Sequence, residues 1–263
     1  MFFVGIDVGS LTAEAVLLRD ERMVAQARMP VRPHPVASAR EVCDSLFRES
    51  DATPERIDFA VSTGYGREQV QAAGMADENI SEISCHAFGA HCLAPGVRTV
   101  VDIGGQDAKA IRVGKAGELE DFVMNDKCAA GTGHFLELMS RTLEVPLEGL
   151  GQLGGRARRP VEMSGRCSIF VETEVIHYLQ RGVAREDIAA GINQAMAGRI
   201  VSLVKRINPQ PALAMTGGVA KNVGVRTEIE KLLRLRITPL NLDPQLVGAY
   251  GAAMLARKLW GAR

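Results

Sequence analysis

The chain has 263 residues, enough for one large domain or two compact ones. Acidic and basic residues balance at 31 each, which argues against nucleic acid or an anionic membrane as a partner. The N-terminus lacks the pattern of a signal peptide, and no stretch approaches the ~20 apolar residues that span a bilayer, so we expect a cytoplasmic location.

Two segments of the chain, around Asp7 and around Asp102, resemble each other. The first reads VGIDVGSLTAEAVLL and the second VVDIGGQDAKAIRV, and aligning the two aspartates also aligns a glycine and two alanines. Each segment predicts a strand, a glycine-rich tight turn and a second strand. P-loop and Rossmann phosphate sites need a helix after the glycine loop, so neither fits. We expect the hairpin amides to hold phosphate, assisted by Ser10 and Thr12.

Two further segments strengthen the case for an internal duplication. DFAVSTGYGR (58–67) and ALAMTGGVAKN (212–222) each predict an apolar strand that runs into Thr-Gly. The whole pattern predicts two copies of a strand-rich unit with helices between the strands. Helical patterns fit residues 36–50, 131–144, 168–181, 186–206 and 223–234, and a helix of small residues fits 246–260. Loops are predicted at 30–35, 146–160 and 207–211.

The two aspartates at the strand ends, Asp7 and Asp102, are candidate catalytic and metal-binding residues. A charged side chain there is costly unless it meets water, a cation or a partner. Two duplicated carboxylates that face one cleft could hold Mg²⁺ through water, and one of them or Gln106 could position the attacking water. Asp107 could contact the metal or Lys109. The alternative is that the aspartates only cap turns.

The cysteines point to a second kind of site. A reducing cytosol disfavours disulfides, so the five thiols are buried groups, metal ligands or redox groups. Cys128 (NDKCAAGTGHFLELM) and Cys167 (MSGRCSIFVETEVIHYL) each stand near a predicted helix start, where free amides favour a thiolate. A [4Fe-4S] cluster takes four thiolates, which two chains related by a two-fold axis would supply. The alternative is two buried structural thiols.

Two other segments have plainer interpretations. CHAFGAHC (85–92) packs its possible ligands too tightly for a typical zinc site, so a packed helix is favoured over a metal site. Cys43 lies on an apparent amphipathic helix and is predicted to belong to the core. The basic loop GGRARRP (154–160) is either a solvated loop or a docking surface for an acidic electron donor or partner enzyme.

Together, the motifs resemble a known ATPase superfamily. The set IDVGSLTAE, TGYGR, DIGGQD, MTGGVAKN and GAYGAA is similar to the phosphate-1, connect-1, phosphate-2, adenosine and connect-2 pattern of the actin/Hsp70/sugar-kinase superfamily. SEISCHAFGA, MNDKCAAGTGHFLE and the Cys167 segment are similar to the BadF/BadG/BcrA/BcrD ATPase family. Within that family the likeness is to the activators of (R)-2-hydroxyacyl-CoA dehydratases, and it covers essentially the whole chain.

The resemblance implies an α/β fold of two duplicated ribonuclease-H-like domains with nucleotide in the cleft. Residues 1–95 plus 240–263 are expected to form the first domain, with a returning C-terminal helix, and 96–239 the second, which carries the cluster cysteines. An ordinary turn remains the alternative for the Thr-Gly-Gly segment, and Lys221 and the residue after it either touch the nucleotide or only start a helix. The expected residues at the ATP or ADP site are Gly9, Ser10, Leu11, Thr12, Gly104, Gly105, Gln106, Asp107, Gly131, Gly133, Thr216, Gly217, Gly218 and Asn222.

The resemblance also implies a homodimer with one [4Fe-4S] cluster at its interface, held by Cys128 and Cys167 of both chains. MgATP would drive the transfer of one low-potential electron to an iron–sulfur acceptor enzyme, such as a 2-hydroxyacyl-CoA dehydratase, in anaerobic metabolism. A ferredoxin or flavodoxin would supply the electron. We expect ATP to close the two domains and shift the helices that follow the two cysteines.

Four other functions compete with this one. Two share its chemistry: the ATPase subunit of a benzoyl-CoA reductase, and the reductase of a double-cubane-cluster protein. Two need no cluster: a sugar or small-metabolite kinase of the same superfamily, and a non-enzymatic nucleotide-sensing module. Iron content separates the first pair from the second.

Overall fold

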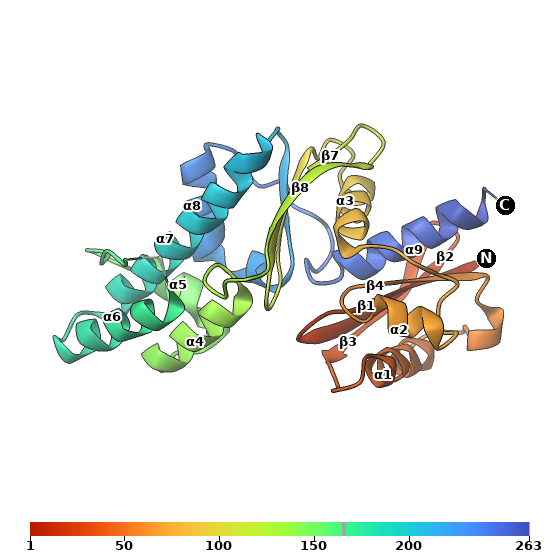
Figure 1. The fold of residues 1–263 in the computed structure, drawn as a ribbon, viewed down its shortest axis with the longest axis horizontal. Coiled ribbons are helices and arrows are strands. Elements are labelled where there is room, and N and C mark those ends of the chain that lie inside the picture. The colour runs from red at the N-terminus through yellow and green to blue at the C-terminus, as the bar shows by residue number, and fades with distance from the viewer. Residues whose placement is uncertain (165–166, 263) are drawn as a thin grey trace. The chain divides into compact units, whose positions relative to one another are not determined.

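The computed structural model describes residues 1–164 and 167–262, which form two compact units (Figure 1). Unit 1 comprises Met1–Val97, Val113–Glu120 and Leu240–Arg263, and unit 2 comprises Arg98–Arg112 and Asp121–Pro239. Each unit has its own sheet and its own buried core. In the described part of the chain, none of the helices combines the length and the hydropathy that a membrane crossing needs.

The sheet of unit 1 has the strand order β3-β2-β1-β4-β5. Strand β1 pairs antiparallel with β2, as the strand–turn–strand pattern predicts, and parallel with β4. All seven residues of β1 are buried, because helices cover both faces of the sheet. The strands are β1 (Phe2–Val8), β2 (Thr12–Arg19), β3 (Arg22–Pro30), β4 (Phe59–Thr63) and β5 (Glu78–Asn79).

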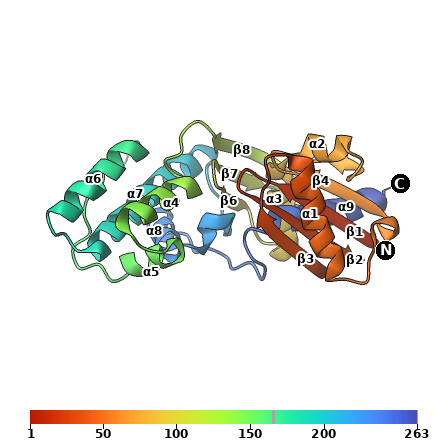
Figure 2. The ribbon, with the colours of Figure 1, turned by 90° about the horizontal axis from the view of Figure 1, so that it is seen from below.

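Helices pack on the two faces of this sheet (Figures 1 and 2). One face carries α1 (Pro35–Arg48), and Val4 joins the core beneath it. The other face carries α9 (Val247–Trp260), where Phe3 is buried. Alternate residues of β1 therefore belong to different cores, as the two-residue period of a strand requires. Helix α2 (Arg67–Ala72) and the 3-10 turn η1 (Pro54–Arg56) complete this part of the unit.

Helix α3 (Glu82–Leu93) packs against α9 through glycines. A Cβ atom on Gly89 would stand 2.6 Å from the carbonyl oxygen of Val247, and one on Gly251 would overlap the carbonyl oxygen of Cys85. The CHAFGAHC segment thus forms the packed helix that the sequence favours, and the prediction of a close-packing C-terminal helix is confirmed.

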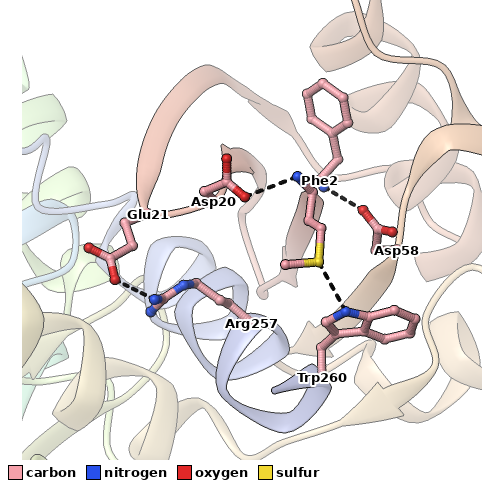
Figure 3. A network of polar contacts seen from close by, with 7 residues as sticks. Phe2, Asp20, Glu21, Asp58, Arg257 and Trp260 are labelled. Carbon is pink, nitrogen blue, oxygen red and sulfur yellow. Dashed lines mark hydrogen bonds and ion pairs between the residues drawn. The ribbon is translucent and has the colours of Figure 1, made fainter. Parts of the chain in front are cut away.

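The N-terminus of unit 1 is tied to its surroundings by polar contacts (Figure 3). The Phe2 amide donates to Asp58 at 2.6 Å, and the terminal amine of Met1 pairs with Asp20 at 3.0 Å. The Trp260 indole N–H donates to the Met1 sulfur at 3.2 Å. The Trp260 contact holds Met1, the residue before β1, against the last turn of α9.

The sheet of unit 2 repeats this plan with the strand order β8-β7-β6-β9. Strand β6 pairs antiparallel with β7 and parallel with β9, just as β1 pairs with β2 and β4. The duplication predicted from the sequence is therefore present in the strand pairing itself. The strands are β6 (Thr99–Ile103), β7 (Ala108–Val113), β8 (Leu119–Asn125) and β9 (Leu213–Thr216).

Among the described residues, five α-helices accompany this sheet, and a large core joins the sheet to the helices (Figure 1). Helix α7 contacts α4, α5, α6 and α8, and twelve of its residues are buried. All six predicted helices of the chain are confirmed, with ends within two residues of those predicted. The helices of unit 2 are α4 (Gly133–Leu143), α5 (Leu150–Gly154), α6 (Ser168–Gln180), α7 (Arg185–Val204) and α8 (Val223–Leu233).

The loop predicted over 146–160 is wrong in part, because it contains the 3-10 turn η2 (Leu147–Gly149) and helix α5. Two of its glycines, Gly151 and Gly154, are packing contacts rather than breakers. A Cβ atom on Gly151 would lie 2.9 Å from the amide of Gly224, and one on Gly154 would lie 2.6 Å from the Asn193 side chain. The sequence shows the glycines but not the neighbours that require them.

Candidate functional site

The two candidate aspartates occupy equivalent places in the two sheets. Asp7 lies near the end of β1 and Asp102 near the end of β6, and both are buried. In the parallel pairing, Asp7 stands opposite Thr63 of β4, and Asp102 stands opposite Thr216 of β9. Each carboxylate therefore lies beside the threonine of a Thr-Gly motif. The duplicated motifs of the sequence thus come together pairwise within each unit.

The glycines after these threonines have the same backbone conformation. Gly64 has φ +81° and Gly217 has φ +79°, the left-handed region that favours glycine. A Cβ atom on Gly217 would stand 2.9 Å from Oδ1 of Asp102, and one on Gly64 would overlap Oδ1 of Asp7. Glycine is therefore required at both positions, because a side chain there would collide with the aspartate beside the turn.

The two hairpin turns are closed in the same way. The amide of Gly9 donates to the carbonyl oxygen of Thr12 at 3.0 Å, and the amide of Gly104 donates to that of Asp107, also at 3.0 Å. The tip residues are more accessible than the aspartates: Ser10 and Gly105 are half-buried, while Leu11 and Gln106 are exposed. Each hairpin thus presents a tip above a buried carboxylate, an arrangement suited to phosphate or to its bound cation.

The two hairpins differ in the residue that stands opposite the aspartate on the neighbouring antiparallel strand. Asp102 stands opposite Lys109, whose Nζ donates to it at 3.3 Å and to Asp107 at 2.6 Å. The Thr216 hydroxyl donates to the other oxygen of Asp102 at 2.8 Å. In unit 1 the residue opposite the aspartate is Glu14, another buried carboxyl group. The sequence left two contacts open for Asp107, with a metal ion or with Lys109, and the structure shows the one with Lys109.

A histidine also lies at the unit 1 carboxylate. A Cβ atom on Gly248, in the first turn of α9, would meet both Oδ2 of Asp7 and, at 2.9 Å, Nε2 of His86. The sequence predicts that His86 lies on a packed helix but does not connect this residue with Asp7. The missed signal is the pair of small-residue segments, SEISCHAFGA and GAYGAA, whose close packing brings the imidazole to the end of β1.

The predicted adenosine segment begins at Thr216, the last residue of β9, and continues through Gly217 into the 3-10 turn η4 (Gly218–Lys221). Asn222 then caps α8: its Oδ1 accepts from the Val225 amide at 3.0 Å, and its Nδ2 donates to Asn193 at 3.3 Å. The helix-starting alternative for Asn222 matches these contacts. A nucleotide contact by this residue stays a prediction.

The start of α4 is hydrogen-bonded to the second hairpin tip. The amide of Gly133 donates to the carbonyl oxygen of Gly104 at 2.8 Å, and the amide of His134 donates to that of Gly105 at 2.9 Å. Gly131, with φ +109°, lies in the turn that precedes this helix. The second hairpin is thus joined directly to the segment that carries Cys128.

The five cysteines differ in the pKa of their thiols and in their exposure. Burial raises the pKa of the Cys43 and Cys85 thiols to about 12 and that of the Cys92 thiol to about 11. These thiols therefore stay protonated at neutral pH and are poor ligands. Cys128 is exposed, and Cys167, like Cys92, is half-buried. The prediction that Cys43 belongs to the core is confirmed.

The two accessible cysteines lie in different local structures. Cys167 is the residue before the first turn of α6, in extended conformation, which confirms its predicted place at a helix start. Cys128 lies before the capping residue of α4, in a turn where its carbonyl oxygen accepts from the Asn125 side chain at 2.9 Å. Nearby, the Thr132 hydroxyl donates to the carbonyl oxygen of Ala129 at 2.6 Å. Backbone contacts therefore hold the Cys128 turn in place.

Both cysteines fit half of a cluster site. Within residues 1–164 and 167–262, no three side chains of His, Cys, Asp or Glu gather as a metal site would require. Cys128 lines the same cavity as Arg199 of α7, and Cys167 stands at the start of α6, which packs against α4. Two accessible thiols per chain are half of the four thiolates that a [4Fe-4S] cluster takes.

The basic loop lies beside the start of α7. The side chains of Arg156, Arg158 and Arg159 are exposed, while the amides of Arg158 and Arg159 each donate to Asp187 at 2.8 Å. Asp187 thus anchors the loop backbone and leaves the arginine side chains facing outward. Donor docking at this loop stays a prediction.

Comparisons with known proteins agree on the family. The chain matches the BadF/BadG/BcrA/BcrD ATPase family over residues 4–256. It is 42% identical over 256 residues to the activator of lactoyl-CoA dehydratase from Anaerotignum propionicum, covering 97% of both chains. It is 41% identical over 259 residues to the (R)-2-hydroxyglutaryl-CoA dehydratase activating ATPase from Acidaminococcus fermentans, covering 98% of both.

Solved structures agree on the fold. The activator of the 2-hydroxyisocaproyl-CoA dehydratase from Clostridium difficile, with bound ADPNP, superposes with a TM-score of 0.93 at 39% identity, covering 100% of this chain and 96% of that one. A ROK family glucokinase from Streptomyces griseus shares the fold alone, with a TM-score of 0.57 at 15% identity over 98% of this chain and 100% of that one. The predicted actin/Hsp70/sugar-kinase fold is confirmed. The chain belongs to the BadF/BadG/BcrA/BcrD ATPase family.

Proposed function

We propose that this protein is an ATP-dependent activator that delivers single low-potential electrons to an iron–sulfur acceptor enzyme, such as a 2-hydroxyacyl-CoA dehydratase. Two copies of the chain would share one [4Fe-4S] cluster, and a ferredoxin or flavodoxin would supply the electron. The relatives named as dehydratase activators support this role. The observation that carries it is the hydrogen bonding of the second hairpin tip to the helix that follows Cys128.

The hairpin tips are the proposed contacts for MgATP. The tip residues are more accessible than the buried aspartates near the ends of the adjoining strands, Asp7 in one unit and Asp102 in the other. Phosphoryl transfer needs placement and charge neutralisation more than covalent chemistry by the protein. We therefore assign the two aspartates to Mg²⁺, through water, and the exposed Gln106 to the attacking water.

The link from hairpin to cysteine is short. Any change in the second hairpin tip on nucleotide binding or hydrolysis would act on the two hydrogen bonds that the amides of Gly133 and His134 donate to it. Those residues open α4, and Cys128 lies in the turn just before that helix. Such coupling requires that ATP bind two conformations with different affinity. Movement at this helix end would change the hydrogen bonding and exposure of the thiolate, two properties that set cluster potential.

Helix α6 has exposed apolar side chains that a second copy of the chain would cover. Ile169 and Phe170, in the first turn of α6 beside Cys167, are 68% and 64% exposed, and Ile176 lies farther along the same helix at 43%. Exposed apolar side chains that gather on one surface mark interaction sites. A two-fold axis near Cys167 would bury these residues and bring four thiolates together. When bound there, the cluster would accept and release one electron.

The competing functions differ in what they require of the cysteines. A kinase or a nucleotide-sensing module gives no reason for an exposed thiol, Cys128, on the same cavity as Arg199, or for the half-buried thiol of Cys167 at a helix start. A benzoyl-CoA reductase subunit and a double-cubane-cluster reductase would use the same site with another acceptor. The sequence identity to relatives named as dehydratase activators favours a dehydratase as the acceptor enzyme.

The test is to purify the protein without oxygen and to measure iron, acid-labile sulfide and native mass. We expect about two irons per chain in a dimer, because one four-iron cluster is shared by two chains. The Cys128→Ser/Cys167→Ser double variant is expected to lose the iron, while Cys43→Ser, a substitution in the core of α1, keeps it. Absence of iron in the wild-type protein under strictly anaerobic conditions would contradict the proposal and favour a kinase or a sensing module.

A further inference from the structure

Arg199 lies on α7, on the wall of a cavity of about 390 Å³ in unit 2. Cys128 and Gly131, from the turn before α4, line the same cavity. Residue 199 is far from residue 128 in sequence, and only the packing of α7 beside this turn brings them together. A half-buried cation therefore faces the segment that carries one of the proposed ligands.

The guanidinium of Arg199 has a nitrogen left over for a ligand. Its Nη2 is buried, and no residue in the described ranges accepts a hydrogen bond from it. Its Cζ lies 5.9 Å from the centre of the Phe135 ring, so α4 fixes the side chain from one side. A buried N–H group without an acceptor is unfavourable. An anion beside the cavity would relieve that penalty.

As ligands of a cluster, the two cysteines would be anionic thiolates. Cys128 lines the cavity together with Arg199, and Cys167 stands at the start of α6, which packs against α4 and α7. Burial lowers the pKa of Arg199, while the charges of Cys128 and Cys167 act in the opposite direction. Hydrogen bonds from a cation to a ligating sulfur, and the charge itself, are established means of tuning an iron–sulfur centre.

We propose that Arg199 is a positioning residue for the cysteine pair, whose guanidinium donates N–H groups to the thiolate sulfurs and stabilises the reduced state of the bound cluster. The inference rests on the proposed function. Reduction adds one electron from the ferredoxin or flavodoxin and no proton, so the reduced site carries one more negative charge. A nearby positive charge stabilises that state and makes the reduction potential less negative.

The experiment compares variants of Arg199 with a variant of Arg206, which lines the same cavity from the 3-10 turn η3 (Lys205–Ile207) after α7 but is exposed. R199M and R199Q remove the charge while keeping a long side chain near Phe135. R199K keeps the charge but not the planar fork of donors. R206M is the matched control. The readouts are the midpoint potential from an EPR-monitored redox titration and the rate of iron loss to a chelator, with a thermal melt to confirm folding.

We expect R199M and R199Q to shift the midpoint to more negative potential and to weaken iron retention about tenfold or more, as loss of an outer partner does in other metal sites. R199K should restore most of the potential and less of the retention, and R206M should resemble wild type. An unchanged potential in either folded neutral variant, or an equal shift in R206M, overturns the inference. Wild-type protein that binds no iron would instead overturn the proposed function.

Discussion

Two buried aspartates, at equivalent positions of a duplicated hairpin, have different neighbours. Asp102 is held by Lys109 and Thr216, whereas the cross-strand neighbour of Asp7 is Glu14. The two copies of the hairpin therefore place different side chains beside their carboxylates, although both aspartates occupy the same position of the strand.

Lys109 is predicted to be essential for stability. The K109M variant should lose about 3–5 kcal/mol of unfolding free energy, because it leaves Asp102 and Asp107 buried without their cation. K231M, which removes an exposed lysine paired with Glu228, should lose less than about 1 kcal/mol. Urea unfolding of both variants measures the difference. Equal losses would show that the buried ion pairs contribute no more than a surface pair.

Helix packing in unit 1 depends on glycines that face another backbone. On α9, Gly251 lies against the Cys85 carbonyl group, and on α3, Gly89 lies against that of Val247. Glycine lowers helix propensity, so its presence in two helix interiors needs a compensating contact. Here the contact is the close approach of α3 and α9, which also brings His86 to Asp7. The element that positions the candidate site is thus the helix pair.

The contact is tested by two substitutions of helical glycines. G251A should destabilise the protein by about 1–3 kcal/mol, because the added methyl group forces the two helices apart. G198A, on α7, places its methyl group where no atom lies within 4 Å and should stabilise by about 0.5–1 kcal/mol. Thermal and urea unfolding give both values. A stabilising G251A would mean that the helix contact is loose.

At the scale of the whole molecule, a single chain carries only half of the proposed redox site. Two accessible cysteines and an exposed apolar stretch of α6 lie together, and neither is completed within the described residues. A second copy would complete both at once. Each hairpin turn, by contrast, is closed by a hydrogen bond within its own unit.

Dimer formation is predicted to depend on Phe170. The F170E variant should lower the native mass from dimer to monomer and abolish iron binding, because it buries a charge at the proposed two-fold contact. L232E changes an exposed leucine of α8 and should leave the dimer intact. Light scattering coupled to anaerobic gel filtration distinguishes the two. A dimeric, iron-loaded F170E would place the contact elsewhere.

Local patterns in the sequence determined the strand–turn–strand hairpins, their duplication, the six helices and the family. These features were predictable because alternation, helical periodicity and glycine turns are properties of neighbouring residues. Strands β3 and β8 were not predicted. Along β8, polar side chains stand at exposed and less exposed positions alike, so its periodicity is weak, whereas β3 alternates exposed residues with less exposed apolar ones, a signal that the sequence did contain. Helix α5 was hidden by glycines that the sequence could only suggest to be breakers.

Only the tertiary structure decided which of the marked residues meet. It pairs Lys109 with two aspartates, uses the Asn222 side chain to cap α8, buries the thiols of Cys43 and Cys85 and places Arg199 on the same cavity as Cys128. The partners in these contacts come from different strands and helices. Their meeting depends on how whole elements pack, and no local pattern along one segment records it.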